Sequence, residues 1–163
     1  MSDDRPISLR FPIALVLSIV CLATLAWADY EAGWDAYNRG DYGTAFREWQ
    51  PLAEQGDANV QVLLGILYDK GQRGPHDSVQ ALLWFEKAAA QGNATAQVWL
   101  GALYEAGKGG PQDFVQAYKW YTLGEANGDK KAAKFRDALA KQMTPTQIAE
   151  AQQLVRKWKP KGK

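Results

Sequence analysis

One spacing dominates this sequence, because a long phrase is written twice. The stretch LGILYDKGQRGPHD starts at Leu64, and its near copy LGALYEAGKGGPQD starts at Leu100, 36 positions later. The same spacing separates Gly56, Gly92 and Gly128. It also separates Leu67 and Leu103, Tyr68 and Tyr104, Gly71 and Gly107, Asp77 and Asp113, Ala81 and Ala117, and Trp84 and Trp120. A fixed period of this length is typical of repeat proteins, in which each unit buries its apolar face against the next. We therefore interpret the phrase as a scaffold and expect function in the residues that differ between copies.

Each unit is predicted to hold two helices joined by a short loop. Apolar residues recur at helical spacing in the first helix, and Gly71 ends this run as a left-handed cap would. The second helix is predicted to begin at Asp77, where Gln80 three residues later completes a capping box. Small residues such as Gly65 and Ala81 are expected to let two helices approach closely. The same pattern recurs one period later, so the phrase encodes helix packing.

These motifs resemble the Sel1-like repeat family, a branch of the tetratricopeptide-like helical repeats. Residues 58–92 and 93–128 match its pattern, and residues 29–57 resemble the shorter tetratricopeptide form. The resemblance implies an all-α, right-handed solenoid of helix-turn-helix units that serves as a surface for binding other proteins. Residues 129–163 are expected to form a degenerate repeat, a capping helix and a basic tail.

The last segment keeps only part of the repeat pattern. Ala132, Phe135 and Leu139 continue the apolar phase of a first helix, although the Leu-Gly and Tyr positions are lost. The sequence from Thr144 to Gln147 then predicts a capping box with proline at the first helical position, which opens a helix extending to about Trp158. Terminal units of solenoids are usually atypical because they must face water.

The first 28 residues have the layout of a secretory signal peptide. Arg10 precedes the apolar run Ile13–Ala26, and cleavage is predicted after Ala28. This run of 14 residues is shorter than the roughly 20 that span a bilayer. The sequence therefore predicts a periplasmic or secreted protein that is not an integral membrane protein after cleavage. An uncleaved membrane anchor and a misread buried helix remain the alternatives.

The mature chain is predicted to lack cysteine and to carry an uneven charge distribution. Cys21 is the only cysteine and lies within the signal, so no disulfide is available, and Val20 before it disfavours lipidation. Residues 29–129 carry 7 Lys/Arg against 14 Asp/Glu, a net charge of −7. Residues 130–163 carry 10 Lys/Arg against 2 acidic residues, a net charge of +8. The chain is therefore predicted to have a basic C-terminal end.

The residue inventory offers little chemistry for an enzyme. His76 is the only histidine and is expected to be a loop residue, since neither a metal-ligand set nor a triad surrounds it. The glycine-rich stretch 107–110 lacks the spacing of a phosphate loop. Asn93 opens a glycosylation sequon but is also a good helix cap. The sequence thus indicates no catalytic residues, metal, cofactor or nucleic-acid partner.

A candidate binding groove follows from the resemblance, because the first helix of each tetratricopeptide-like unit lines the concave face. The residues selected in this way are Tyr30, Trp34, Tyr37, Asn38, Asn59, Val62, Ile66, Asp69, Thr95, Val98, Ala102, Glu105, Lys131, Lys134 and Lys141, with Trp99 beside them. Such a groove has an aromatic end, an apolar floor and a basic end, and it is expected to bind a protein or peptide. For Trp34 and Tyr37, packing within the first unit is an equally good interpretation.

Two other functions compete with a peptide-binding groove. The tail VRKWKPKGK places Arg156, Lys157, Lys159, Lys161 and Lys163 around Trp158, which is typical of a segment that binds an anionic surface or polymer. A cell-wall hydrolase or transferase is the third reading, but no acid and base can be assigned to it. The leading hypothesis is an exported, non-enzymatic adaptor, and the sequence names neither its partner, its pathway nor its oligomeric state.

Overall fold

The structure is a computed structural model that describes residues 27–72 and 74–161. Every regular element within these residues is an α-helix. Residues 27–38 are helical, and the helices that follow are α2 (Tyr42–Glu54), α3 (Ala58–Asp69), α4 (Ser78–Ala90), α5 (Ala94–Ala106), α6 (Phe114–Ala126), α7 (Ala132–Ala140) and α8 (Pro145–Lys157). The predicted signal peptide lies outside the described residues, apart from Trp27 and Ala28.

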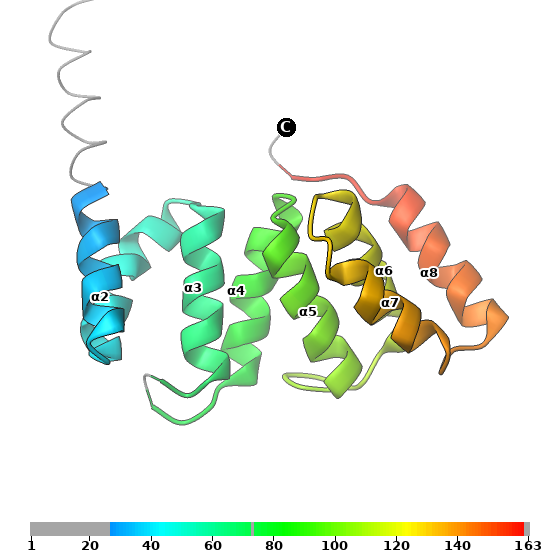
Figure 1. Cartoon of the computed structure of the whole chain (residues 1–163), viewed down its shortest axis with the longest axis horizontal. Helices are drawn as coiled ribbons and strands as arrows, with labels where there is room; N and C mark the ends of the chain where they lie inside the picture. Colours follow the sequence, from blue (N-terminus) through cyan, green and yellow to red (C-terminus); the bar gives the residue numbers. More distant parts are fainter. Residues whose placement is uncertain (1–26, 73, 162–163) are drawn as a thin grey trace, which may run out of the picture.

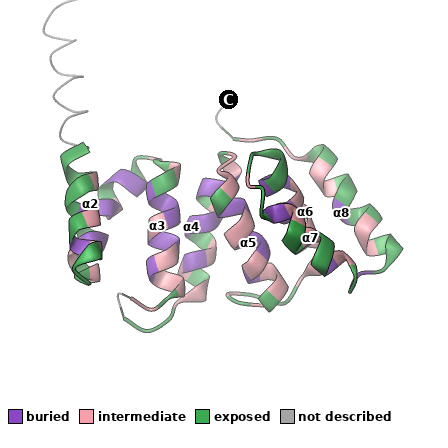
Figure 2. Cartoon of the chain, in the orientation of Figure 1, coloured by how far each residue is buried: buried purple, intermediate pink, exposed green. Residues whose placement is uncertain are grey.

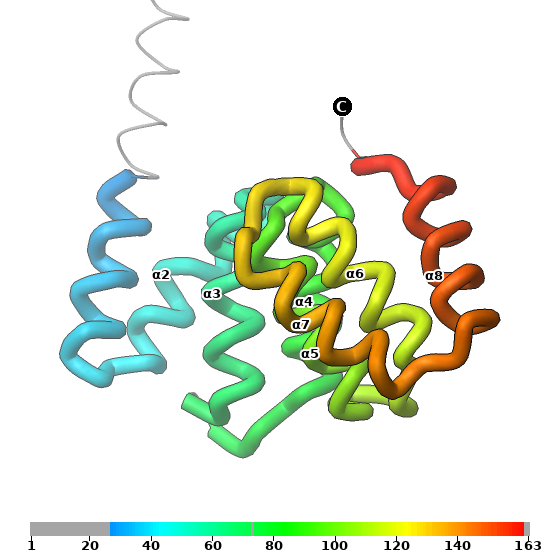
Figure 3. The backbone as a smooth tube through the Cα atoms, turned by 45° about the vertical axis from the view of Figure 1, so that its right-hand side comes forward, coloured from blue at the N-terminus to red at the C-terminus, as the bar shows by residue number. Residues whose placement is uncertain are grey.

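The helices follow one another along the long axis of the molecule in chain order (Figure 1). Each extensive contact joins two helices of the same unit or of adjacent units, as between α3 and α4 or between α4 and α5. The turned view in Figure 3 shows α7 lying across the array in front of α5 and α8 at its end. This arrangement is the predicted α-solenoid of helix pairs.

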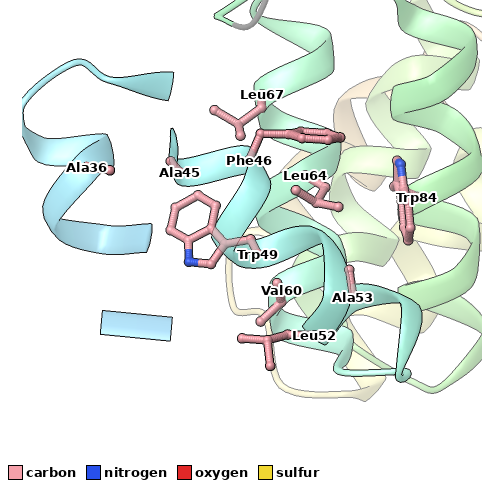
Figure 4. Packing of buried hydrophobic residues seen from close by; sticks show 10 residues of the cluster. All are labelled: Ala36, Ala45, Phe46, Trp49, Leu52, Ala53, Val60, Leu64, Leu67 and Trp84. Carbon is pink, nitrogen blue, oxygen red and sulfur yellow. The ribbon is translucent and has the colours of Figure 1, made fainter. Parts of the chain in front are cut away.

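The buried side chains form one core that continues through the array, because each cluster joins neighbouring units (Figure 2). The first cluster, drawn in Figure 4, contains Ala36, Ala45, Phe46, Trp49, Leu52, Ala53, Val60, Leu64, Leu67 and Trp84. The second cluster is centred on Phe85, Leu100 and Leu103, and the third on Tyr121 and Leu139. No unit buries its apolar face alone, which explains why the same residues recur at one spacing.

The glycine of the Leu-Gly pair is required by a close approach of two helices. A Cβ added at Gly65 would lie 2.6 Å from the Phe85 ring, and one at Gly101 would lie 2.7 Å from the Tyr121 ring. These contacts are too short for any other residue unless the ring moves. The packing role predicted for the repeated phrase is therefore confirmed at both copies.

The predicted capping boxes of α4 and α6 are wrong in one half. The Asp77 side chain accepts the Gln80 N–H at 3.0 Å, as expected. The Asp77 N–H was predicted to donate to the Gln80 side chain. It donates instead to the Tyr68 carbonyl oxygen of the preceding helix at 3.2 Å. A backbone partner is already in place, so the glutamine has no donor to reach. Of the three predicted boxes, the one at α8, between Thr144 and Gln147, closes in full.

A pair of buried glutamines links the units and was not recognised from the sequence. Gln97, which is fully buried, donates from Nε2 to the Ala89 carbonyl oxygen at 3.1 Å and accepts from Asn127 Nδ2 at 2.9 Å. Gln61, one period earlier, makes the equivalent bonds with Ala53 and Gln91. Because an unpaired buried amide is costly, these bonds fix the register in which one unit stacks on the next.

Helix α7 departs from the predicted apolar phase at one residue. Ala132 and Leu139 are fully buried, as expected, whereas the Phe135 side chain is 43% exposed. The Phe135 ring covers Tyr121 of α6 from the surface, and the Arg136 guanidinium of the same helix contacts the carboxylate of Glu125. Helix α7 is therefore rotated so that Phe135 lies at the surface.

Candidate functional site

The most apolar hollow of the groove lies between α5 and α7. Its lining residues are Val98, Trp99 and Ala102 of α5, Tyr121 of α6 and Phe135 of α7, and its volume is about 180 Å³. We call this hollow the apolar pocket. Of the residues predicted for the groove, the structure brings Val98, Trp99 and Ala102 together here.

Aromatic contacts hold two walls of the apolar pocket in place. The Trp99 ring stacks on the buried Phe85 ring, with 5.7 Å between centroids and an angle of 2° between planes. The Phe135 ring lies against Tyr121 with 5.6 Å between centroids. Trp99 and Phe135 are 36 residues apart, as are Phe85 and Tyr121, so both walls use the same repeat positions. The repeat geometry thus places equivalent residues on both walls. The pocket has aromatic walls because Trp99 and Phe135 occupy the position that Leu63 holds in the earlier unit.

Glu105, another predicted groove residue, forms a hydrogen bond with Tyr121 of the pocket wall. The Tyr121 hydroxyl donates to Glu105 Oε2 at 2.7 Å. Burial, together with this hydrogen bond to a carboxylate, raises the pKa of Tyr121. Tyr104 donates similarly to Glu86 Oε1 at 3.2 Å, and burial followed by the charge of Glu86 raises the pKa of Tyr104 to about 12.

These two tyrosines predict a specific loss of stability at alkaline pH. Because the pKa of Tyr104 is higher in the folded chain than its ordinary value of about 10, its contribution to stability is fully present below pH 10. It is lost as the pH rises from about 10 through about 12. In an absorbance titration, Tyr104 and Tyr121 should ionise above pH 10, together with unfolding. A Tyr121→Phe chain should lose one of these two groups from the titration. Ionisation of Tyr104 and Tyr121 near pH 10 in the folded chain would contradict the two hydrogen bonds.

A second hollow lies one turn away, at the N-terminal ends of α5 and α7. Its volume is about 390 Å³, and it is lined by Ala94, Thr95, Asn127, Gly128, Asp129, Lys130 and Lys131. Asp129 Oδ1 accepts the Lys131 backbone N–H at 2.8 Å, so this carboxylate is turned toward the backbone. We call this region the basic hollow. Lys134, also predicted for the groove, is exposed on the next turn of α7.

The groove residues of the second unit offer less surface than predicted. Val62 is only 6% exposed and belongs to the second core cluster, so its role is packing. Ile66 also packs against that cluster. Asp69 faces Lys108 of the next unit in an ion pair at 3.5 Å, with its side chain 10% exposed. Asn59 accepts a hydrogen bond at 2.9 Å from Asn93, which also caps α5.

The aromatic end of the predicted groove packs within the first unit. The Trp34 ring lies edge-on to the buried Trp49, with 5.4 Å between centroids, and Tyr37 contacts Tyr42 at 5.3 Å. Both Trp34 and Tyr37 are half-buried against the first core cluster. Of the two interpretations open for these residues, the packing favours the structural one. Asn38 is exposed at the end of its helix.

The basic tail is docked on the array. Trp158 lies edge-on to Trp120 of α6, with 6.4 Å between ring centroids, and the Lys161 N–H donates to the Ala90 carbonyl oxygen at 2.7 Å. Figure 1 shows this segment turning back from α8 toward the middle of the array. Trp158 is half-buried in this contact, which does not support its predicted use as a surface-binding aromatic, and Lys163 lies outside the described residues.

The described part of the chain contains no group of three or more His, Cys, Asp or Glu that could hold a metal ion. His76 is exposed in the loop before α4, and its Nδ1 lies 2.6 Å from the Asp69 carbonyl oxygen. None of the helices in residues 27–72 and 74–161 is both long and apolar enough to cross a membrane. Lys141, the last predicted groove residue, is exposed beyond the end of α7 and lines neither hollow.

Two residues that build the pocket were missed in the sequence as groove residues, namely Tyr121 and Phe135. The signal for Phe135 was present, because Leu63, Trp99 and Phe135 occupy one repeat position. Leu63 and Trp99 each pack against a core cluster, and Phe135 is the last member of this row. A row of large apolar residues at one position of successive first helices therefore marks a groove lining.

Comparisons with known proteins agree with this architecture. The family model for the Sel1 repeat matches residues 58–93 and 94–129. A solved Sel1 repeat protein from Oxalobacter formigenes is 31% identical, with a TM-score of 0.63, over 74% of this chain and 98% of that one. A solved protective antigen present in uropathogenic Escherichia coli strains, which displays an SLR fold, is 28% identical with a TM-score of 0.77.

The antigen match covers 82% of this chain but only 29% of the antigen, so this chain spans less than a third of that protein's length. No curated protein matches the sequence. The similarity to the two solved structures therefore concerns the repeat array and its packing.

Proposed function

This chain belongs to the Sel1-repeat family, and on that premise we propose that it is an exported, non-enzymatic adaptor that binds a protein or peptide in its groove. Sel1-repeat proteins generally mediate protein–protein interactions and are typically non-catalytic scaffolds. The observation that carries the proposal is the apolar pocket, where Phe135 is 43% exposed beside the buried Tyr121 and faces the partly buried Trp99. Exposed aromatic rings beside a pocket are typical anchors of protein interfaces.

The site between α5 and α7 supports binding rather than catalysis. Its polar groups are lysines, an amide, a threonine and the Asp129 carboxylate, which accepts the Lys131 backbone N–H. The nearby Glu105 accepts a hydrogen bond from Tyr121. A general acid and base would need to face a common reacting atom, and this site has no such pair. An apolar pocket beside cations instead provides a desolvated anchor and electrostatic orientation for a partner.

Binding is tested by purifying the tagged full chain gently from the source cell envelope at low and moderate salt. A partner held by apolar anchors should persist at moderate salt, because screening weakens only the charged contacts. It should be lost from a Phe135→Ala/Lys134→Ala chain and retained by a Lys157→Gln/Lys159→Gln chain. Material that is salt-labile and unaffected by the groove substitutions would contradict the proposal.

Export is tested separately on the same preparation. The N-terminus of the envelope-associated protein should begin at Asp29, because the signal is predicted to be cleaved after Ala28. Recovery in the cytoplasmic fraction with the N-terminus intact would contradict export without bearing on the groove.

A further inference from the structure

We infer that the groove between α5 and α7 recognises a polypeptide segment in which one large apolar side chain lies close to an Asp or Glu side chain. The apolar side chain enters the apolar pocket, and the carboxylate pairs with Lys131 and Lys134. This inference rests on the proposed function, since it names the class of partner that the same groove takes.

The size of the apolar pocket limits what it can accept. Its volume of about 180 Å³ is below the roughly 300 to 1,000 Å³ of sites that enclose drug-sized ligands. Its walls are the rings of Trp99, Tyr121 and Phe135 with the small side chains of Val98 and Ala102. Such a hollow fits one aliphatic or aromatic side chain and leaves the partner's backbone outside.

The basic hollow continues the same groove toward the N-terminal ends of the helices. Lys131 precedes Phe135 by four residues, so the two share a face of α7. On the other side, Thr95 precedes Trp99 by four residues along α5. A segment anchored by its apolar side chain in the pocket therefore passes the lysines within a few residues.

The lysine side chains of this region have no ion-pair partner among the described residues, because the one carboxylate in the hollow, Asp129, accepts a backbone N–H. Lys130, Lys131 and Lys134 are exposed, and none of them forms an ion pair with another described residue. Arg136 of the same helix is different, because it pairs with Glu125 and Asp137. A partner that lies along the groove must bring its own carboxylate to meet these lysines, which selects acidic segments and speeds their association.

The inference is tested by selecting peptides that bind the mature full chain from a displayed library of random internal segments. Internal display removes free C-termini, so any carboxylate comes from Asp or Glu. The selected peptides should combine a large apolar residue with an acidic residue within a few positions. The affinity of one selected peptide is then compared with that of the same peptide carrying Gln or Asn in place of the acid.

Four variants of the chain locate the bound peptide. Phe135→Ala should weaken binding at least tenfold, and Ala102→Leu, which fills the pocket, should do the same. Lys131→Gln/Lys134→Gln should weaken the acidic peptide by roughly tenfold but leave the neutral peptide unchanged, because the two changes remove the same ion pair. The matched double change Lys157→Gln/Lys159→Gln on the tail should have no effect.

Two kinds of outcome would overturn the inference while leaving the proposed function in place. One is selection of peptides without acidic residues, or equal affinity for the acidic peptide and its Gln or Asn counterpart. The other is binding that survives both pocket variants and is lost on Trp34→Ala. If no peptide binds the folded chain at all, both the inference and the proposed groove are wrong. Thermal unfolding of each variant verifies that it is folded.

Discussion

Replacing Gly101 by valine is expected to lower the free energy of unfolding by about 3 kcal/mol. A Cβ at this position would lie 2.7 Å from two atoms of the Tyr121 ring, and the valine methyl groups would extend further. The ring cannot move away at low cost, because it is 2% exposed and its hydroxyl is bonded to Glu105. Overpacking of this kind forces strained rotamers or separates α5 from α6. Urea unfolding followed by circular dichroism measures the change.

The control for this substitution is another glycine of the same unit. At Gly110 a Cβ would meet no atom within 4 Å, and the residue does not have a positive φ. Gly110→Val should therefore change stability by less than about 0.5 kcal/mol. Equal stability of the two variants would show that the helices do not approach as closely as the structure has them.

Replacing Trp49 by alanine is expected to cost about 3 to 5 kcal/mol, mostly within the first unit. The Trp49 side chain is fully buried, it contacts Trp34 and Tyr37, and its Nε1 donates to the Tyr30 carbonyl oxygen at 3.2 Å. Since each unit of an array contacts only its neighbours, the loss should remain local. Hydrogen exchange should show faster exchange in residues 29–54 and nearly unchanged protection in α5 and α6.

This variant also distinguishes the two ends of the groove. If the apolar pocket binds the partner, Trp49→Ala should leave the affinity nearly unchanged, because the pocket is built from later units. Loss of binding in the Trp49→Ala chain, with α5 and α7 still protected, would instead assign the partner to Trp34 and Tyr37. The measurement uses the mature chain and a partner or peptide identified as above.

The fold was predictable because the repeated motifs mark the helix ends, the turns and the close helix contacts. Gly65 and Gly101 mark close helix approaches, Gly71 and Gly107 adopt the predicted positive φ, and α8 begins with the predicted capping box. The pattern did not indicate which of two possible acceptors a backbone N–H would bond. The N–H of Asp77 prefers a backbone carbonyl over a glutamine, and no local sequence rule describes that competition.

The site was only partly predictable, for a related reason. The rule that first helices line the groove selected Val98, Trp99 and Lys131 without indicating how each helix is rotated. Rotation of α7 is set by long-range contacts, including the contact between Arg136 and Glu125, and it brings Phe135 to the surface. The packing of Trp158 on Trp120 likewise depends on the path of the backbone after α8, which turns back onto the array. Sequence periodicity therefore predicts where each helical unit lies in the chain. Which side chains of the last unit are exposed depends on contacts that periodicity does not describe.

Site-specific photo-crosslinking in the source cells shows whether the partner lies in the groove beside Phe135. A photoreactive phenylalanine analogue is placed at Phe135 in one chain and, as a control, at Leu83, which is 44% exposed on α4 and outside both groove hollows. We expect one protein, identified by mass spectrometry, to be crosslinked from position 135 and not from position 83. Crosslinking of the same protein from position 83 alone, or equally from both positions, would contradict it.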